Sequence, residues 1–301
     1  MRVAAVDLGS NSTRLLVADV VAGRVEEVGR GRRITRLGEG VDTRRRLLPV
    51  PVARVRNVLA DFRRELERLG AERTLAVATS AVRDAENGEA FLGEIEWSYG
   101  FSTRLLSGDE EAQLTWRGVT AGRPLEGGTL VVDVGGGSTE LVTASGHESL
   151  DVGCVRMTER LGEDVEAIER YVTDALPAFE AERAIGVAGT VTALAALDLG
   201  LVDYDPERVH GHVLSAAALD AQLERLAALS LPERRRLPGL EPERAPVIVA
   251  GAAILRAVLR RYGLDGIEAS EHDLLHGVAL AAAELPARPE DDVPPGAFTC
   301  C

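Results

Sequence analysis

The chain has 301 residues, enough for about two domains, and its composition (46% apolar, 27% charged) is typical of a globular protein in solution. Its formal net charge of −14 argues against nucleic acid as a partner. All 34 basic residues are arginine, which excludes a P-loop nucleotide site and Schiff-base chemistry, because both require lysine.

The sequence shows no signal for secretion or for a membrane. Asp7 interrupts the first apolar run, and no segment approaches the ~20 apolar residues that a membrane span needs. The three cysteines, Cys154, Cys300 and Cys301, do not suggest a disulfide framework. Two of them end an acidic, proline-rich tail that we expect to be frayed. The expected location is therefore the reducing cytoplasm.

The first half of the sequence predicts a mixed α/β unit. Apolar residues at helical spacing predict a helix from Val52 to Leu69, which Gly70 ends. A second helix is expected from Ser107 through Trp116, with Ser107 as N-cap and Glu110 at the capping-box position. Strands are predicted at Val3–Asp7, Arg14–Val20, Val25–Arg33, Thr74–Ala78 and Phe101–Leu106.

The second half repeats this order of elements. Apolar strands surround Asp133, and a helix carrying Val165, Ile168, Val172 and Leu176 follows. The remaining predicted elements are a strand at Ala184–Ala188, a long apolar helix at Ala245–Tyr262, a strand at Gly266–Ser270 and a helix from about Asp273 to Glu284. The sequence therefore indicates the duplication of one α/β unit.

An internal repeat is the most informative feature. TLVVDVGGGSTELVT (129–143) aligns with VAAVDLGSNSTRLLV (3–17) at one offset of 126 residues. Each copy has an apolar strand, an aspartate, a turn of small residues and a second apolar strand. Two such hairpins facing each other across a cleft would offer carboxylates and backbone N–H groups to a phosphate chain and its metal ion. An ordinary glycine-rich hairpin is the alternative for either copy alone, and the matched pair makes it less favoured.

These residues resemble the acetate kinase–sugar kinase–Hsp70–actin superfamily and, within it, the exopolyphosphatase/guanosine pentaphosphate phosphatase (Ppx/GppA) family. The resembling segments stand in the family's order at 4–20, 78–88, 107–119, 131–142, 152–161, 187–197, 244–255 and 268–280. The chain is similar to the short members, which have no additional C-terminal helical domain.

The resemblance implies an α/β fold of two duplicated actin/ribonuclease H-like domains with a cleft between them. The first domain would comprise residues 1–118 together with a C-terminal helix at about 283–301. The second would comprise residues 119–282.

The resemblance also implies two catalytic residues. Glu111 matches the family's general base, which would orient and deprotonate the water that attacks the terminal phosphorus in line. Its place in a first helical turn favours the ionised form, although carboxylates are common there for dipole reasons alone, as Glu110 illustrates. Arg83 matches an arginine that would neutralise charge on the transferred phosphoryl group. A surface ion pair with Asp84 or Glu86 is the alternative for Arg83.

Asp133 and Glu140 are the expected partners of Mg²⁺, directly or through water, with Asp7 as a weaker candidate. Turn stabilisation is the alternative role for Asp7. Arg14 occupies the position in the first hairpin that Glu140 occupies in the second, so we expect the second hairpin to do more of the metal binding. The residues expected to cradle phosphates are Gly9, Ser10, Asn11, Ser12, Gly135, Gly136, Gly137, Ser138, Gly189 and Thr190.

The five histidines do not predict a metal site. His210 and His212 are too sparse for zinc. His272-Asp273 spells an HD dipeptide, but the further upstream ligands of an HD phosphohydrolase are not apparent. Local hydrogen bonding is the expected role of these side chains.

The expected function is a Mg²⁺-dependent hydrolase that releases terminal orthophosphate from inorganic polyphosphate. Hydrolysis of guanosine pentaphosphate is a sibling activity that the motifs do not separate from it. Three arginine clusters (Arg30–Arg33, Arg44–Arg46 and Arg234–Arg236) are candidates for a polyphosphate track, and solvated surface charge is the commoner alternative. No nucleic acid or membrane partner is expected, and a homodimer is expected by family analogy alone.

Two rival functions stay open at this point. One is an ATP-dependent kinase or ATPase of the same superfamily. The other is a non-catalytic sensor of polyphosphate or of guanosine alarmones.

Overall fold

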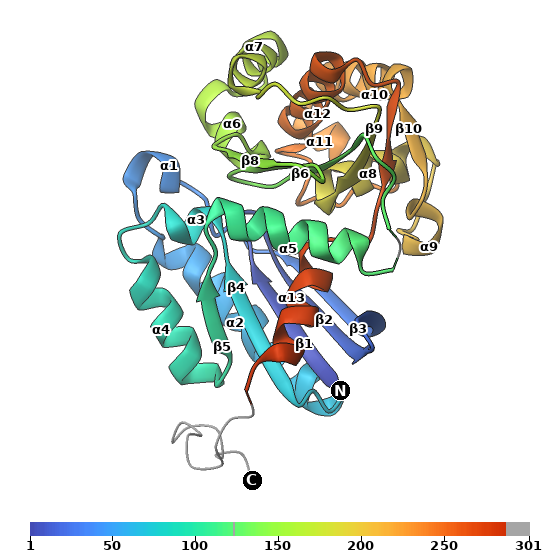
Figure 1. Cartoon of the computed structure of the whole chain (residues 1–301). Coiled ribbons are helices and arrows are strands. Elements are labelled where there is room, and N and C mark those ends of the chain that lie inside the picture. Colours follow the sequence, from blue (N-terminus) through green and yellow to red (C-terminus); the bar gives the residue numbers. More distant parts are fainter. Residues whose placement is uncertain (123, 287–301) are drawn as a thin grey trace. The chain divides into compact units, whose positions relative to one another are not determined.

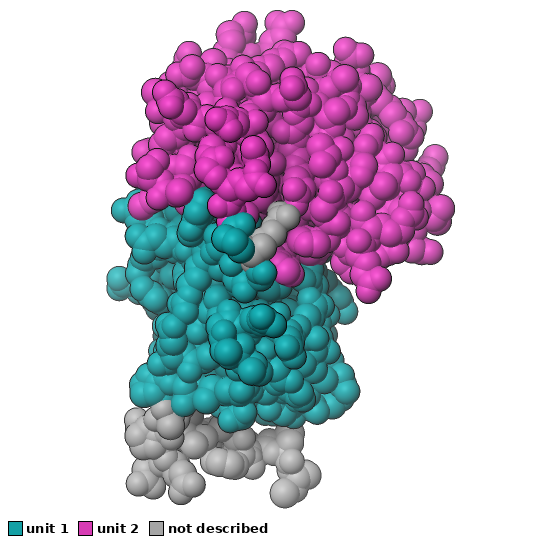
Figure 2. All heavy atoms as spheres, turned by 45° about the vertical axis from the view of Figure 1, so that its right-hand side comes forward, with its two compact units in different colours: residues 1–124, 274–301 teal, residues 125–273 magenta. Residues whose placement is uncertain are grey.

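The computed structural model describes residues 1–122 and 124–286, which form two compact units. Unit 1 comprises Met1–Pro124 and the chain from Leu274 onward, and unit 2 comprises Leu125–Asp273 (Figure 2). The predicted frayed tail, Cys300 and Cys301 lie outside the described residues. So does most of the helix expected at about 283–301.

Unit 1 contains a five-stranded sheet in the order β3-β2-β1-β4-β5 (Figure 1). Strand β2 is antiparallel to both of its neighbours, β3 and β1, and β4 and β5 continue the sheet in parallel with β1. The strands are β1 Arg2–Leu8, β2 Ser12–Val21, β3 Arg24–Ile34, β4 Arg73–Ala78 and β5 Ser102–Leu105. The helices are α1 Val41–Arg44, α2 Pro49–Arg68, α3 Ser80–Arg83, α4 Gly88–Tyr99, α5 Gly108–Thr120 and α13 Leu274–Glu284.

Both faces of this sheet are covered, which explains the continuous apolar run of β1. Ala4 and Val6 belong to a core cluster with α2 and α4, whereas Val3 and Ala5 point to the opposite face and share a cluster with α13. Successive side chains of a strand point to opposite faces, so a strand buried on both sides must be apolar throughout. Figure 1 shows α13 and α5 on one side of the sheet and α2 on the other.

Unit 2 has a six-stranded sheet in the order β10-β11-β9-β6-β7-β8. Read from β8 to β11, this order and its strand directions repeat those of β3 to β5, with β10 added antiparallel at the edge. The strands are β6 Thr129–Val134, β7 Thr139–Val142, β8 His147–Leu150, β9 Arg183–Val187, β10 Val213–Ser215 and β11 Gly266–Ala269. The predicted duplication of a ribonuclease H-like unit is thereby confirmed.

Helices of unit 2 follow its strands along the chain. They are α6 Cys154–Leu161, α7 Val165–Ala175, α8 Ala188–Asp198, α9 Pro206–Val209, α10 Ala216–Ala228, α11 Leu231–Arg234 and α12 Ile248–Tyr262. The long apolar helix begins at Ile248 rather than at the predicted Ala245. Hydrogen-bonded turns occupy the preceding residues, in which the Val247 amide donates to the Arg244 carbonyl at 3.0 Å.

The unit boundaries differ from the predicted ones near residues 118 and 283. Helix α5 runs on to Thr120, so the first boundary falls at 124. Helix α13 belongs to unit 1 over its whole length, because Leu274, Leu275 and Val278 share a core cluster with β1 and β4. The chain therefore returns to unit 1 about nine residues earlier than the resemblance implied.

Among the described residues, the structure contains no helix with the length and apolar character that crossing a membrane requires.

Candidate active site

The β6–β7 hairpin of unit 2 places two carboxylates opposite each other. Asp133 and Glu140 are direct cross-strand partners, and both are buried (5% and 1% exposed). Glu140 Oε1 also accepts a hydrogen bond from Ser149 Oγ on β8 at 2.9 Å. Like charges directly opposite each other on a sheet repel, and burial strengthens the repulsion. Such a pair fits a divalent cation that keeps part of its water shell, as Mg²⁺ does.

The matching hairpin of unit 1 is electrically different. Asp7 is the cross-strand partner of Arg14, and Arg14 Nε lies 2.8 Å from Asp7 Oδ2, with both side chains largely buried. The carboxylate is therefore balanced by an arginine within its own hairpin. This arrangement weakens the case for Asp7 as a direct Mg²⁺ ligand, a role that stays a prediction.

The two predicted phosphate-binding turns close in the same way. The Gly135 amide donates to the Ser138 carbonyl at 3.0 Å, and the Gly9 amide donates to the Ser12 carbonyl at the same distance. A Cβ atom at either glycine would lie 3.0 Å from that carbonyl oxygen, tighter than nearly all Cβ contacts. The turn at each hairpin therefore favours glycine at its first position.

Asn11 carries the most direct sign of a ligand in the first turn. Its side chain is 6% exposed, and neither its amide nitrogen nor its oxygen has a hydrogen-bond partner within the described residues. The neighbouring Ser10 Oγ accepts from the Ala81 amide at 3.2 Å, which ties the turn to α3. A buried amide left without a partner loses the solvation it had in water. A phosphate oxygen that accepts from Asn11 Nδ2 would restore one of its hydrogen bonds.

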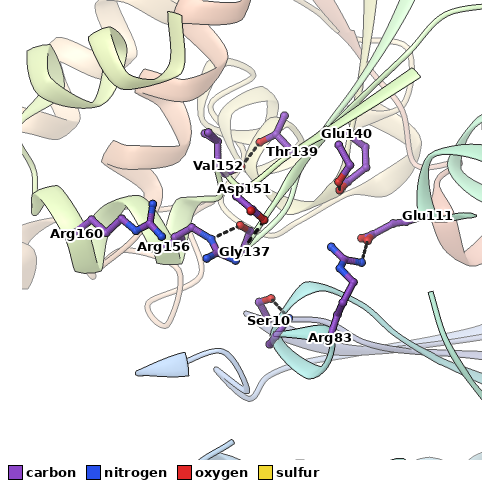
Figure 3. A network of polar contacts seen from close by, with 12 residues as sticks. Ser10, Arg83, Glu111, Gly137, Thr139, Glu140, Asp151, Val152, Arg156 and Arg160 are labelled. Carbon is purple, nitrogen blue, oxygen red and sulfur yellow. Dashed lines mark hydrogen bonds and ion pairs between the residues drawn. The ribbon is translucent and has the colours of Figure 1, made fainter. Parts of the chain in front are cut away.

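Glu111 and Arg83 come together in unit 1. Glu111 is buried in the first turn of α5, as expected, and Arg83 is the last residue of α3. Arg83 Nη1 donates to the Leu106 carbonyl at 2.8 Å and lies 3.4 Å from Glu111 Oε2 (Figure 3). The structure thus brings together the two residues that sequence reasoning assigned to catalysis. The contact with Arg83 uses Oε2 of Glu111 and not Oε1.

The start of α5 is fixed by the predicted capping box. Ser107 Oγ accepts from the Glu110 amide at 3.2 Å, and a Glu110 carboxylate oxygen accepts from the Ser107 amide at 2.9 Å. This pair satisfies two of the N–H groups that a helix start leaves free. Glu110 therefore caps the start of α5, whereas the adjacent Glu111 contacts Arg83.

The third predicted turn, at Gly189 and Thr190, begins α8. Thr190 Oγ1 donates to the Val134 carbonyl at 3.3 Å, which ties the turn to the strand that carries Asp133. A Cβ atom at Gly189 would lie only 2.2 Å from Arg244 Nη2, so the guanidinium rests directly on this glycine.

Sequence reasoning missed Arg244 as a member of this site. Its side chain is buried, and its charge also acts on Cys154, whose thiol pKa is raised by burial while Arg244 and a hydrogen bond with Thr190 oppose the rise. A signal was present, because an arginine stands immediately before an apolar helix inside the resembling segment 244–255.

Other predicted candidates have local partners. Arg234, a candidate for the polyphosphate track, is 1% exposed and pairs with Glu163, so it is not a solvated surface charge. Arg30 pairs with Glu27 at 2.7 Å in the first cluster. Arg44–Arg46 are exposed and stay candidates.

The histidines also make local contacts. His212 Nε2 lies 2.7 Å from Asp198 Oδ2, and the rings of His210 and His272 are 4.9 Å apart. Within residues 1–122 and 124–286, no three His, Cys, Asp or Glu side chains gather into a group that could hold a metal ion without further ligands.

Known proteins of one family are similar to this chain over nearly its whole length. The Ppx/GppA phosphatase family matches residues 16–285. A protein of Mycobacterium tuberculosis named exopolyphosphatase 2 is 38% identical over 319 residues, covering 94% of this chain and 98% of the relative. The crystal structure of an exopolyphosphatase-like protein is similar with a TM-score of 0.87 and 35% identity, covering 93% of this chain and 97% of the other. A Ppx/GppA family member from Aquifex aeolicus is similar with a TM-score of 0.77 and 30% identity, covering 94% and 98%.

Proposed function

Since the chain belongs to the Ppx/GppA phosphatase family, we propose that it is an exopolyphosphatase, which releases terminal orthophosphate from inorganic polyphosphate. The name of the M. tuberculosis relative supports this substrate class. The observation that carries the proposal is the contact of Glu111 with Arg83, because a carboxylate base beside a guanidinium suits the attack of water on a phosphoryl group.

Glu111 acts as the general base in this proposal. It takes a proton from a water molecule whose oxygen forms a bond to the terminal phosphorus. The bond from that phosphorus to the bridging oxygen breaks at the same centre, and the products are orthophosphate and a chain shorter by one phosphate. Arg83 donates hydrogen bonds to the phosphoryl oxygens and neutralises the charge they carry. Asn11 and the backbone N–H groups of the turns bind oxygens of the phosphate chain.

Asp133 and Glu140 are the residues that would hold Mg²⁺, directly or through water. Their opposed, buried carboxylates support this assignment. When bound, Mg²⁺ would neutralise charge on the phosphate chain. Guanosine pentaphosphate is proposed as a second substrate, since it offers the same phosphoanhydride bond and the turns bind phosphate rather than the base.

The test is a phosphate-release assay on short polyphosphate, long polyphosphate, guanosine pentaphosphate and ATP, with Mg²⁺ and with chelator. We expect release from polyphosphate with Mg²⁺ and none with chelator. Turnover of ATP without turnover of polyphosphate would contradict the proposal and favour a kinase or ATPase. Binding of polyphosphate without turnover would favour a sensor.

Glu111→Gln tests the assigned base. Loss of the base should lower kcat by about 10²- to 10⁴-fold while polyphosphate binding persists, because general-base catalysis contributes roughly that factor. Glu110→Gln is the matched control, since glutamine also serves at this capping-box position, and its kcat should stay within about threefold. A Glu111→Gln enzyme with full turnover would exclude Glu111 as the base.

A further inference from the structure

The start of α6 is docked under the turn of the second hairpin. Backbone amides at this helix start donate to two carbonyls of the turn: Cys154 to Gly135 at 3.0 Å, and Val155 and Arg156 to Gly136 at 2.8 and 3.1 Å. A Cβ atom at Gly153 would lie 2.4 Å from the Gly136 carbonyl carbon, so the two backbones approach with no side chain between them.

The third carbonyl of the turn is held by a side chain. Arg156 Nε donates to the Gly137 carbonyl at 2.7 Å, in a buried position (Figure 3). The Arg156 side chain is 7% exposed, and its Nη2 lies 3.8 Å from a carboxylate oxygen of Asp151. Burying a guanidinium is costly unless its donors are used. The Gly137 carbonyl satisfies one of these donors, Nε–H.

Because the carbonyls of the turn are directed at α6, peptide geometry also fixes the direction of the N–H groups that follow them. In a planar trans peptide, the C=O of one residue and the N–H of the next point to opposite sides. Carbonyls 135–137 all point toward α6, so the N–H groups of residues 136–138 point away from it. Successive N–H groups turned to one side form a concavity that binds anions. Within it, the Ser138 N–H is the one whose direction Arg156 sets, through the Gly137 carbonyl.

In the first hairpin, backbone amides donate to the carbonyls of the turn. There the Gly38 amide donates to the Ser10 carbonyl at 2.8 Å, and the Thr35 and Arg36 amides donate to the Asn11 carbonyl at 3.1 and 2.9 Å. A Cβ atom at Gly38 would lie 2.9 Å from Ser10 Cβ, so a glycine lies closely against this turn as well. The side-chain contact is thus a feature of the hairpin that also carries the two opposed carboxylates.

We propose that Arg156 is a positioning residue for phosphate binding by the Gly135–Ser138 turn. Its Nε–H fixes the Gly137 peptide so that the Ser138 N–H is aimed at a phosphate oxygen. Arg156 itself does not touch the substrate in this assignment. The inference rests on the proposed function and adds to it the group that preorganises the turn.

A matched pair of substitutions separates the hydrogen bond from packing and charge. In Arg156→Gln, Nε2 is the fourth side-chain atom, as Nε is in arginine, and it can donate to the same carbonyl. In Arg156→Met, a methyl group occupies that place with similar volume and no donor. We expect Arg156→Met to raise KM for polyphosphate about tenfold with a smaller change in kcat, and Arg156→Gln to recover most of that loss.

Arg160→Met is the control on the same helix. Arg160 is exposed one turn further along and donates to the Tyr171 hydroxyl at 2.9 Å, away from the turn. Its removal should leave kcat and KM within about twofold. Equal effects of Met and Gln at position 156, or a folded Arg156→Met enzyme with unchanged KM, would overturn the positioning role.

A spectroscopic readout needs neither turnover nor a variant. In ¹⁵N-labelled wild-type protein, added orthophosphate should shift the backbone amide resonances of residues 136–138 together with the Nε–H resonance of Arg156, and not that of Arg160. Amide shifts without an Arg156 shift would overturn the proposal even if Arg156→Met failed to fold. Wild-type protein that neither hydrolyses nor binds polyphosphate would instead refute the proposed function.

Discussion

At the residue scale, the contact of Arg244 with Gly189 shows how a glycine lets an arginine approach a candidate phosphate-binding turn. The guanidinium occupies the space that a Cβ atom at position 189 would need. It thereby brings a positive charge next to a turn that was predicted to bind phosphate. Arg244 also lies 3.5 Å from Glu241, which helps to offset its burial.

Gly189→Ala should therefore be destabilising and should weaken phosphate binding. An added methyl group 2.2 Å from Nη2 forces Arg244 or the backbone to move, and overpacking of this kind costs about 1–3 kcal/mol. The measurements are the free energy of unfolding in urea and KM for polyphosphate.

Gly93→Ala is the matched control for this substitution. Gly93 lies within α4, and a Cβ atom there meets nothing within 4 Å. Alanine should stabilise that helix by about 0.5–1 kcal/mol through its better helix propensity. A Gly189→Ala protein as stable and as tight-binding as Gly93→Ala would show that the close approach has no energetic weight.

The individual residues also show where sequence reasoning reached its limit. It predicted the capping box at Ser107 and Glu110, which the structure confirms, because both partners lie within one helical turn. The contacts of Arg244 with Gly189 and of Arg156 with Gly137 join residues 55 and 19 positions apart. No local pattern encodes such pairs, since they depend on how separate helices pack onto a sheet.

At the element scale, α5 is the helix that positions Glu111. Its start is anchored by the Glu110 carboxylate, and its middle is held against α13 by a close backbone approach. A Cβ atom at Gly277 of α13 would lie 1.9 Å from the Leu114 carbonyl oxygen, so the two helices touch where no side chain intervenes. Two substitutions test these anchors separately.

Glu110→Ala should lower stability in a pH-dependent way. The Ser107 backbone N–H holds the pKa of Glu110 below its ordinary value of 4.5, and Arg104 adds to this effect. A carboxyl whose pKa is depressed by folding stabilises the protein above its ordinary pKa, and this contribution is lost as pH falls through the lower, folded value. The variant should be about 1 kcal/mol less stable than wild type near neutral pH, with a smaller difference as pH falls below about 4.5.

Urea unfolding of both proteins at about pH 7, 5 and 4 measures this difference. Activity at neutral pH should persist, because Glu110 has no part in the proposed chemistry. A difference in stability that stays constant down to the lowest pH at which both proteins fold would contradict the assignment of Glu110 as the cap.

Gly277→Ala should separate α13 from α5 and reduce activity. The added methyl group cannot be accommodated without moving one of the helices, at a cost of about 1–3 kcal/mol. Because Glu111 lies in the first turn of α5, the displacement should lower kcat more than it raises KM. Steady-state kinetics and thermal unfolding measure the two effects. Wild-type kcat in a folded Gly277→Ala protein would show that the contact does not help to position Glu111.

Some elements were predictable because their residues show one clear periodicity. The apolar stripe of α2 at Val52, Val55, Leu59, Phe62 and Leu66 is buried as its 3/4 spacing indicates. Helix α8 was not foreseen, because it is buried on nearly all sides from Thr190 to Leu197 and has no polar face to mark a period. Helix α4 was also missed, since it contains two glycines and its buried apolar residues are few.

At the scale of the whole molecule, unit 1 is assembled from two separate stretches of chain. Three large apolar residues of α13, Leu274, Leu275 and Val278, are buried in its core. At about 1.5–3 kcal/mol for each side chain, their burial contributes roughly 5–9 kcal/mol, comparable with the total stability of a small domain. The core cluster of unit 2, in contrast, lies within residues 130–269.

This difference predicts unequal behaviour of the isolated segments. Residues 125–273 should fold alone and unfold cooperatively. Residues 1–124 should not, until residues 274–286 are joined to them through a flexible linker. Circular dichroism with thermal unfolding, and the dispersion of amide resonances, measure both. Cooperative folding of residues 1–124 without α13 would show that the helix is dispensable.

The fold class and the duplication were predictable from the repeated hairpin, whereas the unit boundaries were not. The offset between the halves changes from 126 residues at the hairpins to 110 at β4 and β9. The connection from β3 to β4 contains the 20-residue α2, and the one from β8 to β9 contains the shorter α6 and α7. Where the chain returns to unit 1 depends on which core accepts the apolar face of α13, and that choice is made by tertiary packing.

The split of unit 1 also bears on synthesis at the ribosome. The residues translated first must wait for α13, which is made only after the whole of unit 2 has emerged. Unit 2 can therefore reach its native packing while the earlier-made strands β1 to β5 still lack one covering helix. In a nascent chain, unit 2 would thus complete its fold before unit 1, although most of unit 1 is synthesised first.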